Sequence, residues 1–365
     1  MNRMRNIDLI KNYTSKMINE QKIDIKKNTQ RNNTAKKELK TIKPSTIDTM
    51  ARNVLFLCAA ASFLALLLIT VYILVMGTPI IFKIGIINFV FGKEWNPTPA
   101  SGEPSFGIFP MVIASFFATI GSVLAATFFG VATAIFLAEI APAPICKIFK
   151  PAIEILAGIP SVVYGFFGLV VIVPLIRTYI APPGNSLFAG IIILTFMILP
   201  TIINISEEAL KSVPYEYKEG SYALGATCSR TIFSIELPAA KSGIMASIIL
   251  GTGRAIGETM AVILVTGNSV QMPKSLFSPV RTLTANIALE MGYAFGEHEN
   301  ALFATGVVLF LFIMAINIIF NLLFNKNTAK HHNQNNQSRS SSAIRQNLMQ
   351  LFKRRHIKHD ETQKT

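Results

Sequence analysis

The chain has 365 residues, of which 51% are hydrophobic and 15% are charged, and its mean hydropathy is +0.46. Soluble domains carry about a quarter charged residues, so this composition excludes an ordinary soluble domain. The net charge of +14 is concentrated at the two ends, because residues 1–53 hold thirteen Lys or Arg against five Asp or Glu and residues 326–365 hold nine against two.

Both basic tails adjoin long apolar segments. Such tails either bind nucleic acid or flank the cytoplasmic side of a membrane protein. The adjoining apolar segments favour the membrane, so we expect membrane lipid as a partner and no nucleic acid. The tails are also rich in Asn, Lys, Gln and Ser. We therefore predict that residues 1–53 and 326–365 are disordered cytoplasmic extensions.

Six apolar segments between the tails are long enough to cross the hydrocarbon core as helices, which takes about 20 residues each. They cover residues 54–76, 111–138, 153–176, 187–205, 244–266 and 302–323. Helices are expected because backbone polar groups in lipid must be satisfied internally. The sequence therefore predicts an all-α polytopic membrane protein whose transmembrane domain covers residues 54–325.

The charges also predict the orientation of the six helices. A Lys/Arg-rich start places the N-terminal tail in the cytoplasm, and an even number of crossings returns the basic C-terminal tail to the same side. Both termini are thus expected to be cytoplasmic. The connections 77–110, 177–186 and 267–301 are then outside, whereas 139–152 and 206–243 are inside.

The third apolar segment contains a proline that interrupts its helix. Pro160 removes a backbone hydrogen bond, and its ring displaces the preceding turn. A broken membrane helix is tolerated where its freed groups meet neighbours or line a cavity. Two interpretations stay open: an ordinary packing kink, or a break at which Ser161 borders a polar path.

The cytoplasmic connection 206–243 has the signals of an ordered structure. Pro214 suits the first turn of a helix over residues 215–224. Gly225 ends that helix in the left-handed conformation, and Ser229 begins another that runs through Pro238 into the fifth span. Two short helices joined by a glycine turn form a compact surface for a partner protein. The alternative is an amphipathic linker with no partner.

One motif in this connection resembles a known family. Glu219-Gly220-Ser221 is followed after three residues by Gly225, and after nine more by Ile235, with Leu237-Pro238 one residue later. This spacing is similar to the Glu-Ala-Ala-x3-Gly-x9-Ile-x-Leu-Pro loop of permease subunits in bacterial ABC importers, with small Gly220 and Ser221 in place of two alanines. The resemblance implies that these seven residues dock on an ATP-binding subunit and transmit its motion.

The fifth span carries two charges in its middle. A central Arg or Glu costs about 2.5–3.5 kcal/mol to insert, so both should face protein or water. Arg254 and Glu258 are four residues apart and are expected to share one helix face. Three glycines at positions Gly251, Gly253 and Gly257 predict close helix packing. The pair is either a structural ion pair or an anion path in which Glu258 holds the Arg254 fork in place.

The string Gly-Arg-Ala-Ile-Gly-Glu-Thr-Met-Ala-Val over residues 253–262 resembles the PstC-type permeases of bacterial phosphate importers. Two further segments are similar to the same family, residues 154–165 and the Glu-Trp-Asn-Pro of residues 94–97. The resemblance covers about residues 50–325. It implies the type I importer permease fold in the inner membrane, and a phosphate path for which Arg254, Glu258, Thr259 and Ser161 are the candidate residues.

The same resemblance implies a set of partners. They are a second, PstA-like permease, two copies of an ATP-binding subunit at the cytoplasmic face, and a phosphate-binding protein at the outer face. The chain itself has no Gly-x4-Gly-Lys-Ser/Thr loop for ATP. We expect no cofactor, no metal site and no enzymatic activity. Two alternatives remain: an importer of sulfate, molybdate or phosphonate, and a membrane channel or signalling scaffold.

Overall fold

The computed structural model describes residues 46–100, 102–320 and 322. The described chain is mostly helical and includes one antiparallel pair of short strands, β1 (Trp95–Asn96) and β2 (Ser105–Phe106). The helices are α2 (Thr46–Ile84), α3 (Ile86–Phe91), α4 (Phe109–Ile135), η1 (Phe136–Ile140), α5 (Ala143–Gly158), α6 (Ser161–Phe167), η2 (Gly168–Ile172), α7 (Val173–Tyr179), α8 (Leu187–Lys211), α9 (Tyr215–Ala223), α10 (Cys228–Thr231), η3 (Ile232–Glu236), α11 (Leu237–Gly257), α12 (Met260–Thr266) and α13 (Leu283–Glu290). A last helix covers Glu297–Phe320.

The chain divides into two compact units, Met1–Thr70 and Val71–Thr365. In the first unit, the described residues form the beginning of α2, whose apolar side chains are exposed, as at Leu55 (70%) and Phe63 (68%). Helix α2 begins at Thr46, inside the segment predicted to be a disordered extension. The rest of that segment, and the whole predicted tail 326–365, lie outside the described residues.

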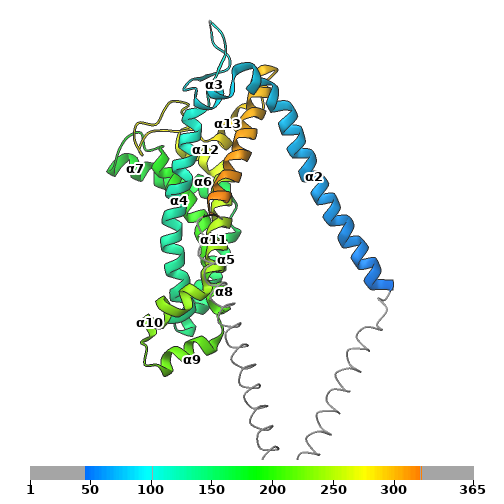
Figure 1. Cartoon of the computed structure of the whole chain (residues 1–365). Helices are drawn as coiled ribbons and strands as arrows, with labels where there is room; N and C mark the ends of the chain where they lie inside the picture. The colour runs from blue at the N-terminus through cyan, green and yellow to red at the C-terminus, as the bar shows by residue number, and fades with distance from the viewer. Residues whose placement is uncertain (1–45, 101, 321, 323–365) are drawn as a thin grey trace, which may run out of the picture. The chain divides into compact units, whose positions relative to one another are not determined.

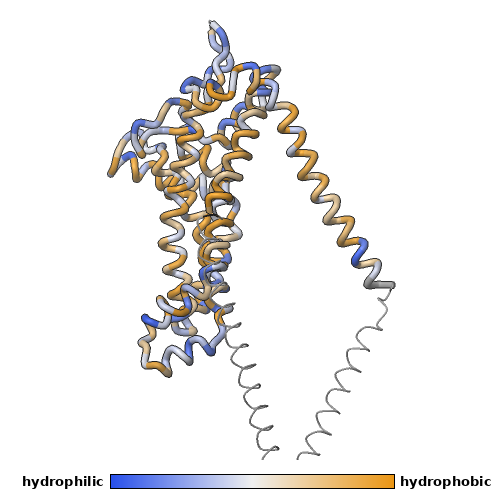
Figure 2. Tube along the Cα trace, viewed as in Figure 1, coloured by the Kyte–Doolittle hydropathy of each residue, from blue (hydrophilic) through white to orange (hydrophobic). Residues whose placement is uncertain are grey.

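Six helices in the described part of the chain are long and apolar enough to cross a membrane, which confirms the predicted number. They are Thr49–Ile84, Phe109–Ile140, Ser161–Tyr179, Leu187–Lys211, Cys228–Gly257 and Glu297–Phe320. Figure 2 shows the hydrophobic residues concentrated along these helices and hydrophilic residues frequent at the turns between them.

The bounds of the third and fifth spans differ from the prediction. The predicted third span, 153–176, is divided, because Ile159 and Pro160 are extended (ψ 129° and 139°) and a new helix starts at Ser161. The predicted fifth span, 244–266, ends early, because Glu258 is extended (ψ 127°) and the short helix α12 follows. The break before Ser161 is the one that Pro160 predicts, whereas the break at Glu258 in the fifth span was not predicted.

The core of the second unit lies between α4, α8 and α11, which run along the bundle (Figure 1). Val123, Ile202 and Ile248 belong to one buried cluster there. A glycine at position 130 allows α4 to approach α8, since a Cβ there would lie 2.8 Å from the Cγ2 of Ile202. This central packing supports the two ends of the bundle.

The two ends differ in their elements, and Figure 1 shows α9 and α10 at one end with α3 and α13 at the other. At the α13 end, Phe89, Trp95 and Met111 pack in a single cluster. A side-chain cap defines the start of α13, where the Oγ1 of Thr282 accepts a hydrogen bond from the backbone nitrogen of Ala285 (3.3 Å). Such caps satisfy backbone donors that the first helical turn leaves unpaired.

Candidate functional site

The loop predicted from the Gly225 motif folds as two helices around a glycine turn. Helix α9 ends at Ala223, and Gly225 takes a left-handed φ of +80°, as predicted. Helix α10 then begins at Cys228, one residue before the predicted restart, and the chain stays helical to Gly257. The Oγ atoms of Ser221 and Thr231 hydrogen-bond at 2.8 Å and join the two helices.

This loop surrounds an open hollow of about 810 Å³, which we call the loop hollow. Its lining residues are Glu216, Tyr217, Gly220, Ser221, Leu224, Gly225, Ala226, Thr227, Arg230 and Ile235. The structure therefore brings four of the seven predicted coupling residues together. The other three, Glu219, Leu237 and Pro238, are not in its lining, and Glu219 is exposed.

A buried ionic cluster lies at the base of this loop. The Nζ of Lys218 is 2.5 Å from Glu139 Oε2 and 3.3 Å from Glu236 Oε2, and we call these three residues the Lys218 cluster. The Glu236 side chain is fully buried, and those of Lys218 and Glu139 are only 16% and 10% exposed. The cluster joins α9 to the ends of two membrane spans. Sequence reasoning missed it because its members are far apart in the chain.

The carboxylates outnumber the cation in the Lys218 cluster. Within the part of the chain that the structure describes, three of their four oxygens, Glu139 Oε1 and both oxygens of Glu236, have no hydrogen-bond partner. Burial lowers the pKa of Lys218, but the hydrogen bond and charge of Glu139 and the charge of Glu236 outweigh it and raise this pKa above the ordinary lysine value. Lys218 therefore stays charged at neutral pH and is the cation that holds the loop to the bundle.

The structure contradicts the predicted direct pairing of Arg254 with Glu258, whereas the anion path at Arg254 stays a prediction. Because α11 ends at Gly257, the two residues do not share a continuous helix, and they form no ion pair within 4.0 Å among the described residues. Instead, Nη1 of Arg254 donates to Thr201 Oγ1 (3.3 Å). The Oε1 of Glu258 accepts from the backbone nitrogen of Ala261 (3.1 Å) and caps α12. Thr259 lies between these helices.

The three glycines of the fifth span divide into two groups. Gly251 is buried against α8, where a Cβ would lie 3.1 Å from the Cγ1 of Ile202. At Gly253 and Gly257 a Cβ would meet no atom of the described residues within 4 Å, and both glycines are exposed. The close packing predicted for the three glycines thus holds within this chain at Gly251, whereas the Gly253 and Gly257 side of α11 is open.

The break before α6 and the break before α12 lie at nearly the same level. A Cβ at Gly165 would be 2.7 Å from the Cα of Ala261, and one at Gly168 would be 2.6 Å from Val265 Cγ1, so α6 and α12 run side by side in the same direction. Pro160 lies five residues before Gly165, and Glu258 lies three residues before Ala261. With a rise of about 1.5 Å per helical residue, the two breaks lie within about one helical turn of each other along the bundle.

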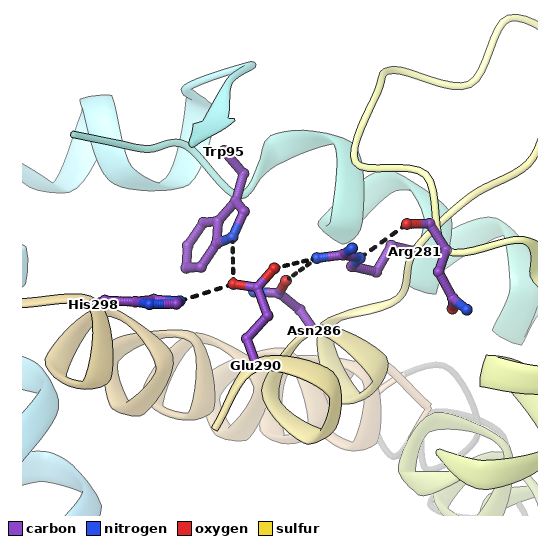
Figure 3. A network of polar contacts seen from close by, with 6 residues as sticks. Trp95, Arg281, Asn286, Glu290 and His298 are labelled. Carbon is purple, nitrogen blue, oxygen red and sulfur yellow. Dashed lines mark hydrogen bonds and ion pairs between the residues drawn. The ribbon is translucent and has the colours of Figure 1, made fainter. Parts of the chain in front are cut away.

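A second ionic cluster is built around Glu290, the last residue of α13, and Figure 3 shows its contacts. Glu290 Oε2 accepts a hydrogen bond from Trp95 Nε1 (2.9 Å) and bonds with His298 Nε2 (2.8 Å), while Oε1 pairs with Arg281. Arg281 also donates to Asn286 Oδ1 (3.1 Å). We call these five residues the Glu290 cluster. No local sequence pattern predicts this cluster, because Trp95 and Glu290 are 195 residues apart.

Comparison with known proteins identifies relatives that match about three quarters of the chain. Residues 130–329 match the family described as binding-protein-dependent transport system inner membrane component. The probable ABC transporter permease protein YqgH of Bacillus subtilis is 43% identical over 278 residues, covering 74% of this chain and 89% of that protein. The phosphate transport system permease protein PstC of Xylella fastidiosa is 33% identical over 300 residues, covering 76% and 91%.

Solved structures share the fold at lower sequence identity. One is the bacterial alginate ABC transporter in complex with an alginate pentasaccharide-bound periplasmic protein, with a TM-score of 0.56 and 14% identity, covering 78% of this chain and 99% of that one. This likeness concerns the fold alone. Family, relatives and six apolar helices agree, so the chain is a multi-pass membrane protein that belongs to the family of inner-membrane components of binding-protein-dependent transport systems.

Proposed function

We propose that this chain is the permease subunit of an ATP-driven importer of inorganic phosphate and forms half of the translocation path. Phosphate as the substrate is supported by relatives that carry the name phosphate transport system permease protein PstC and are 33% to 37% identical to this chain. A PstA-like permease supplies the other half, and the open side of α11 at Gly253 and Gly257 faces the path between them.

The main observation behind the proposal is the surroundings of the Arg254 guanidinium. This guanidinium lies in a membrane span, is partly exposed, and has a hydroxyl of Thr201 as its neighbour instead of a carboxylate. Ionisable groups in spans are costly and usually serve a path or a binding site. An arginine that has no counter-ion among the described residues presents a planar fork of donors to an oxyanion. Ser161 and Thr259 border the same level of the path.

The loop hollow serves the energy-supplying step. Two ATP-binding subunits dock beneath the permease pair, one at each loop, and a phosphate-binding protein docks at the α13 end. Leu224 is 91% exposed beside the loop hollow, and such an apolar side chain is suited to a protein partner. Both termini are then cytoplasmic, and ATP binding and hydrolysis in the partners switch the side to which the path is open.

The experiment is uptake of labelled phosphate by proteoliposomes that hold the chain with its second permease, its ATPase and its binding protein. ATP-dependent uptake that excess sulfate or phosphonate leaves unchanged supports the proposal. Uptake of another oxyanion instead of phosphate would change the proposed substrate and leave the proposed importer function in place. Failure of the chain to bind any ATPase favours a channel or signalling scaffold.

Arg254 is tested in the same proteoliposomes. Arg254→Gln removes the fixed charge and should lower uptake by at least tenfold, while Arg254→Lys keeps the charge without the fork and should lower it less. Arg52→Gln, at an exposed position near the start of α2, is the matched control. If Arg254→Gln prevents assembly of the complex, Arg254 has a structural role, and the path must use other groups.

A further inference from the structure

A basic hollow lies where α5 meets the end of α8. Its volume is about 470 Å³, and its lining is Ala143, Cys146, Lys147, Lys150, Pro151 and Lys211. We call it the lysine hollow. It is separate from the loop hollow and from the residues of the proposed phosphate path.

The charge of the lysine hollow is positive. Glu207 ion-pairs with both Lys150 (2.6 Å) and Lys211, and its side chain is only 7% exposed. One carboxylate therefore serves two ammonium groups, and Lys147 adds a third that has no ion pair among the described residues. The hydrogen bond to Glu207 raises the pKa of Lys150, so this lysine is charged at neutral pH. A net charge of about +2 remains open to solvent.

The position of the hollow along the bundle corresponds to the membrane surface. Lys211 is the last residue of the span Leu187–Lys211, and α5 starts three residues after the end of the span Phe109–Ile140. The end of an apolar span marks the boundary between hydrocarbon and headgroups. The three ammonium groups therefore lie at the depth of lipid phosphates.

Helix α5 has an apolar side that suits the same location. Ile148 and Ile155 are seven residues apart on one face and are 71% and 69% exposed, and Phe149 beside them is 50% exposed. A helix with exposed apolar residues on one side and lysines on another lies in the membrane interface, with the apolar groups among acyl chains. The lysines of α5 then point toward headgroups.

We propose that the lysine hollow binds the phosphate headgroup of one anionic phospholipid, such as phosphatidylglycerol, whose acyl chains lie along the apolar face of α5. Basic pockets between membrane helices at the cytoplasmic surface recognise such headgroups. The proposal does not depend on which ion the protein transports. It assigns Lys147 as the group that contacts lipid alone, since Lys150 and Lys211 are shared with Glu207.

The test is native mass spectrometry of the full-length chain in its complex, titrated in mixed micelles with phosphatidylglycerol or with phosphatidylcholine. One phosphatidylglycerol should bind more tightly than any phosphatidylcholine. Lys147→Gln should weaken this binding about fivefold, which corresponds to about 1 kcal/mol per lysine near an anionic surface. Lys147→Arg should retain it. Lys241→Gln, an exposed lysine on α11 outside the hollow, should leave it unchanged.

Three results would overturn the proposal. The first is equal binding of phosphatidylglycerol by Lys147→Gln and the unchanged chain, or equal binding of the two lipids. The second is displacement of phosphatidylglycerol by inorganic phosphate in a Lys147-dependent manner, which would make the hollow a site for the free ion. The third is loss of the ATPase from Lys147→Gln with unchanged lipid binding, which would assign the hollow to a protein partner.

Discussion

The Lys218 cluster and the Glu290 cluster lie at opposite ends of the bundle, near α9 and at α13 (Figure 1), and their carboxylate oxygens differ in how many hydrogen bonds they accept. In the Glu290 cluster, one oxygen of the carboxylate pairs with Arg281, and the other hydrogen-bonds with Trp95 and His298. In the Lys218 cluster, two carboxylates share one lysine, and three of their four oxygens have no hydrogen bond. A buried polar group without a hydrogen-bond partner lowers stability. A rearrangement that supplies partners would therefore stabilise the Lys218 cluster, whereas the Glu290 carboxylate already has its partners.

This difference agrees with the proposed division of labour along the molecule. The Glu290 cluster joins the strand residue Trp95, the end of α13 and the start of the last span in one fixed arrangement. Among the described residues of this cluster, the buried atom without a hydrogen-bond partner is the neutral Nδ2 of Asn286 and not an atom of a charged side chain. The Lys218 cluster joins the proposed ATPase-docking loop to the membrane spans. A joint of this kind must hold the loop in more than one state during a transport cycle.

The largest expected effect is loss of the Glu290 carboxylate. Glu290→Ala leaves Arg281, whose side chain is only 16% exposed, without its counter-ion, and a broken pair of this kind costs about 3–5 kcal/mol when it is buried. The free energy of unfolding of the purified chain, measured by denaturant titration in detergent, should fall by this amount. Lys83→Gln is the matched control, because Lys83 and Glu297 form an exposed pair that is worth at most about 1 kcal/mol. Equal losses in both variants would contradict the ranking.

Removal of Lys218 should have a smaller effect on stability and a large one on coupling. Lys218→Met leaves Glu139 and Glu236 without a cation and should cost about 2 kcal/mol. In the reconstituted complex, ATP hydrolysis should continue while uptake per ATP falls at least fivefold.

A second substitution tests whether the loss of stability in Lys218→Met comes from the unpaired carboxylates. Glu236→Gln added to Lys218→Met removes one of the two unpaired carboxylates, and it should restore most of the stability, because replacing both partners of a buried pair costs less than removing one. Stability that is no higher in the double variant would mean that the lysine packs against the loop without serving the carboxylates.

Features that depend on local sequence could be predicted, whereas contacts between distant segments could not. The number of spans follows from apolar length, and the loop follows from local signals such as Pro214 and Gly225. By contrast, Lys218 and Glu139 are 79 residues apart and Trp95 and Glu290 are 195 apart, so each pairing depends on helix packing that no local pattern encodes. The break at Glu258 is different, because its cap on Ala261 is only three residues away; it was missed because the flanking residues are apolar enough to suggest one continuous span.

Within the loop, the glycine turn provides a smaller perturbation. Gly225→Val forces a β-branched side chain into φ +80° and should cost about 1–2 kcal/mol. Because the turn sets the angle between α9 and α10, uptake per ATP should fall while the chain still assembles. Gly292→Ala controls for added volume, since a Cβ there meets nothing within 4 Å and φ is not positive, and its stability should change by less than about 0.5 kcal/mol. If uptake per ATP is unchanged in Gly225→Val, the turn does not take part in coupling.

The smallest expected effect is the pH dependence of the Lys218 cluster. The pKa of Lys218 is raised in the folded chain. Its stabilisation is therefore fully present below the unfolded lysine pKa of about 10.4 and is lost as pH rises through the higher folded pKa. The stability difference between the unchanged chain and Lys218→Met should thus stay constant from about pH 6 to 9 and shrink only above about pH 10.5. Thermal unfolding of both chains across that range measures it. A difference that changes between pH 6 and 9 would show that the crowded carboxylates titrate there, and that the loop joint responds to protons as well as to ATP.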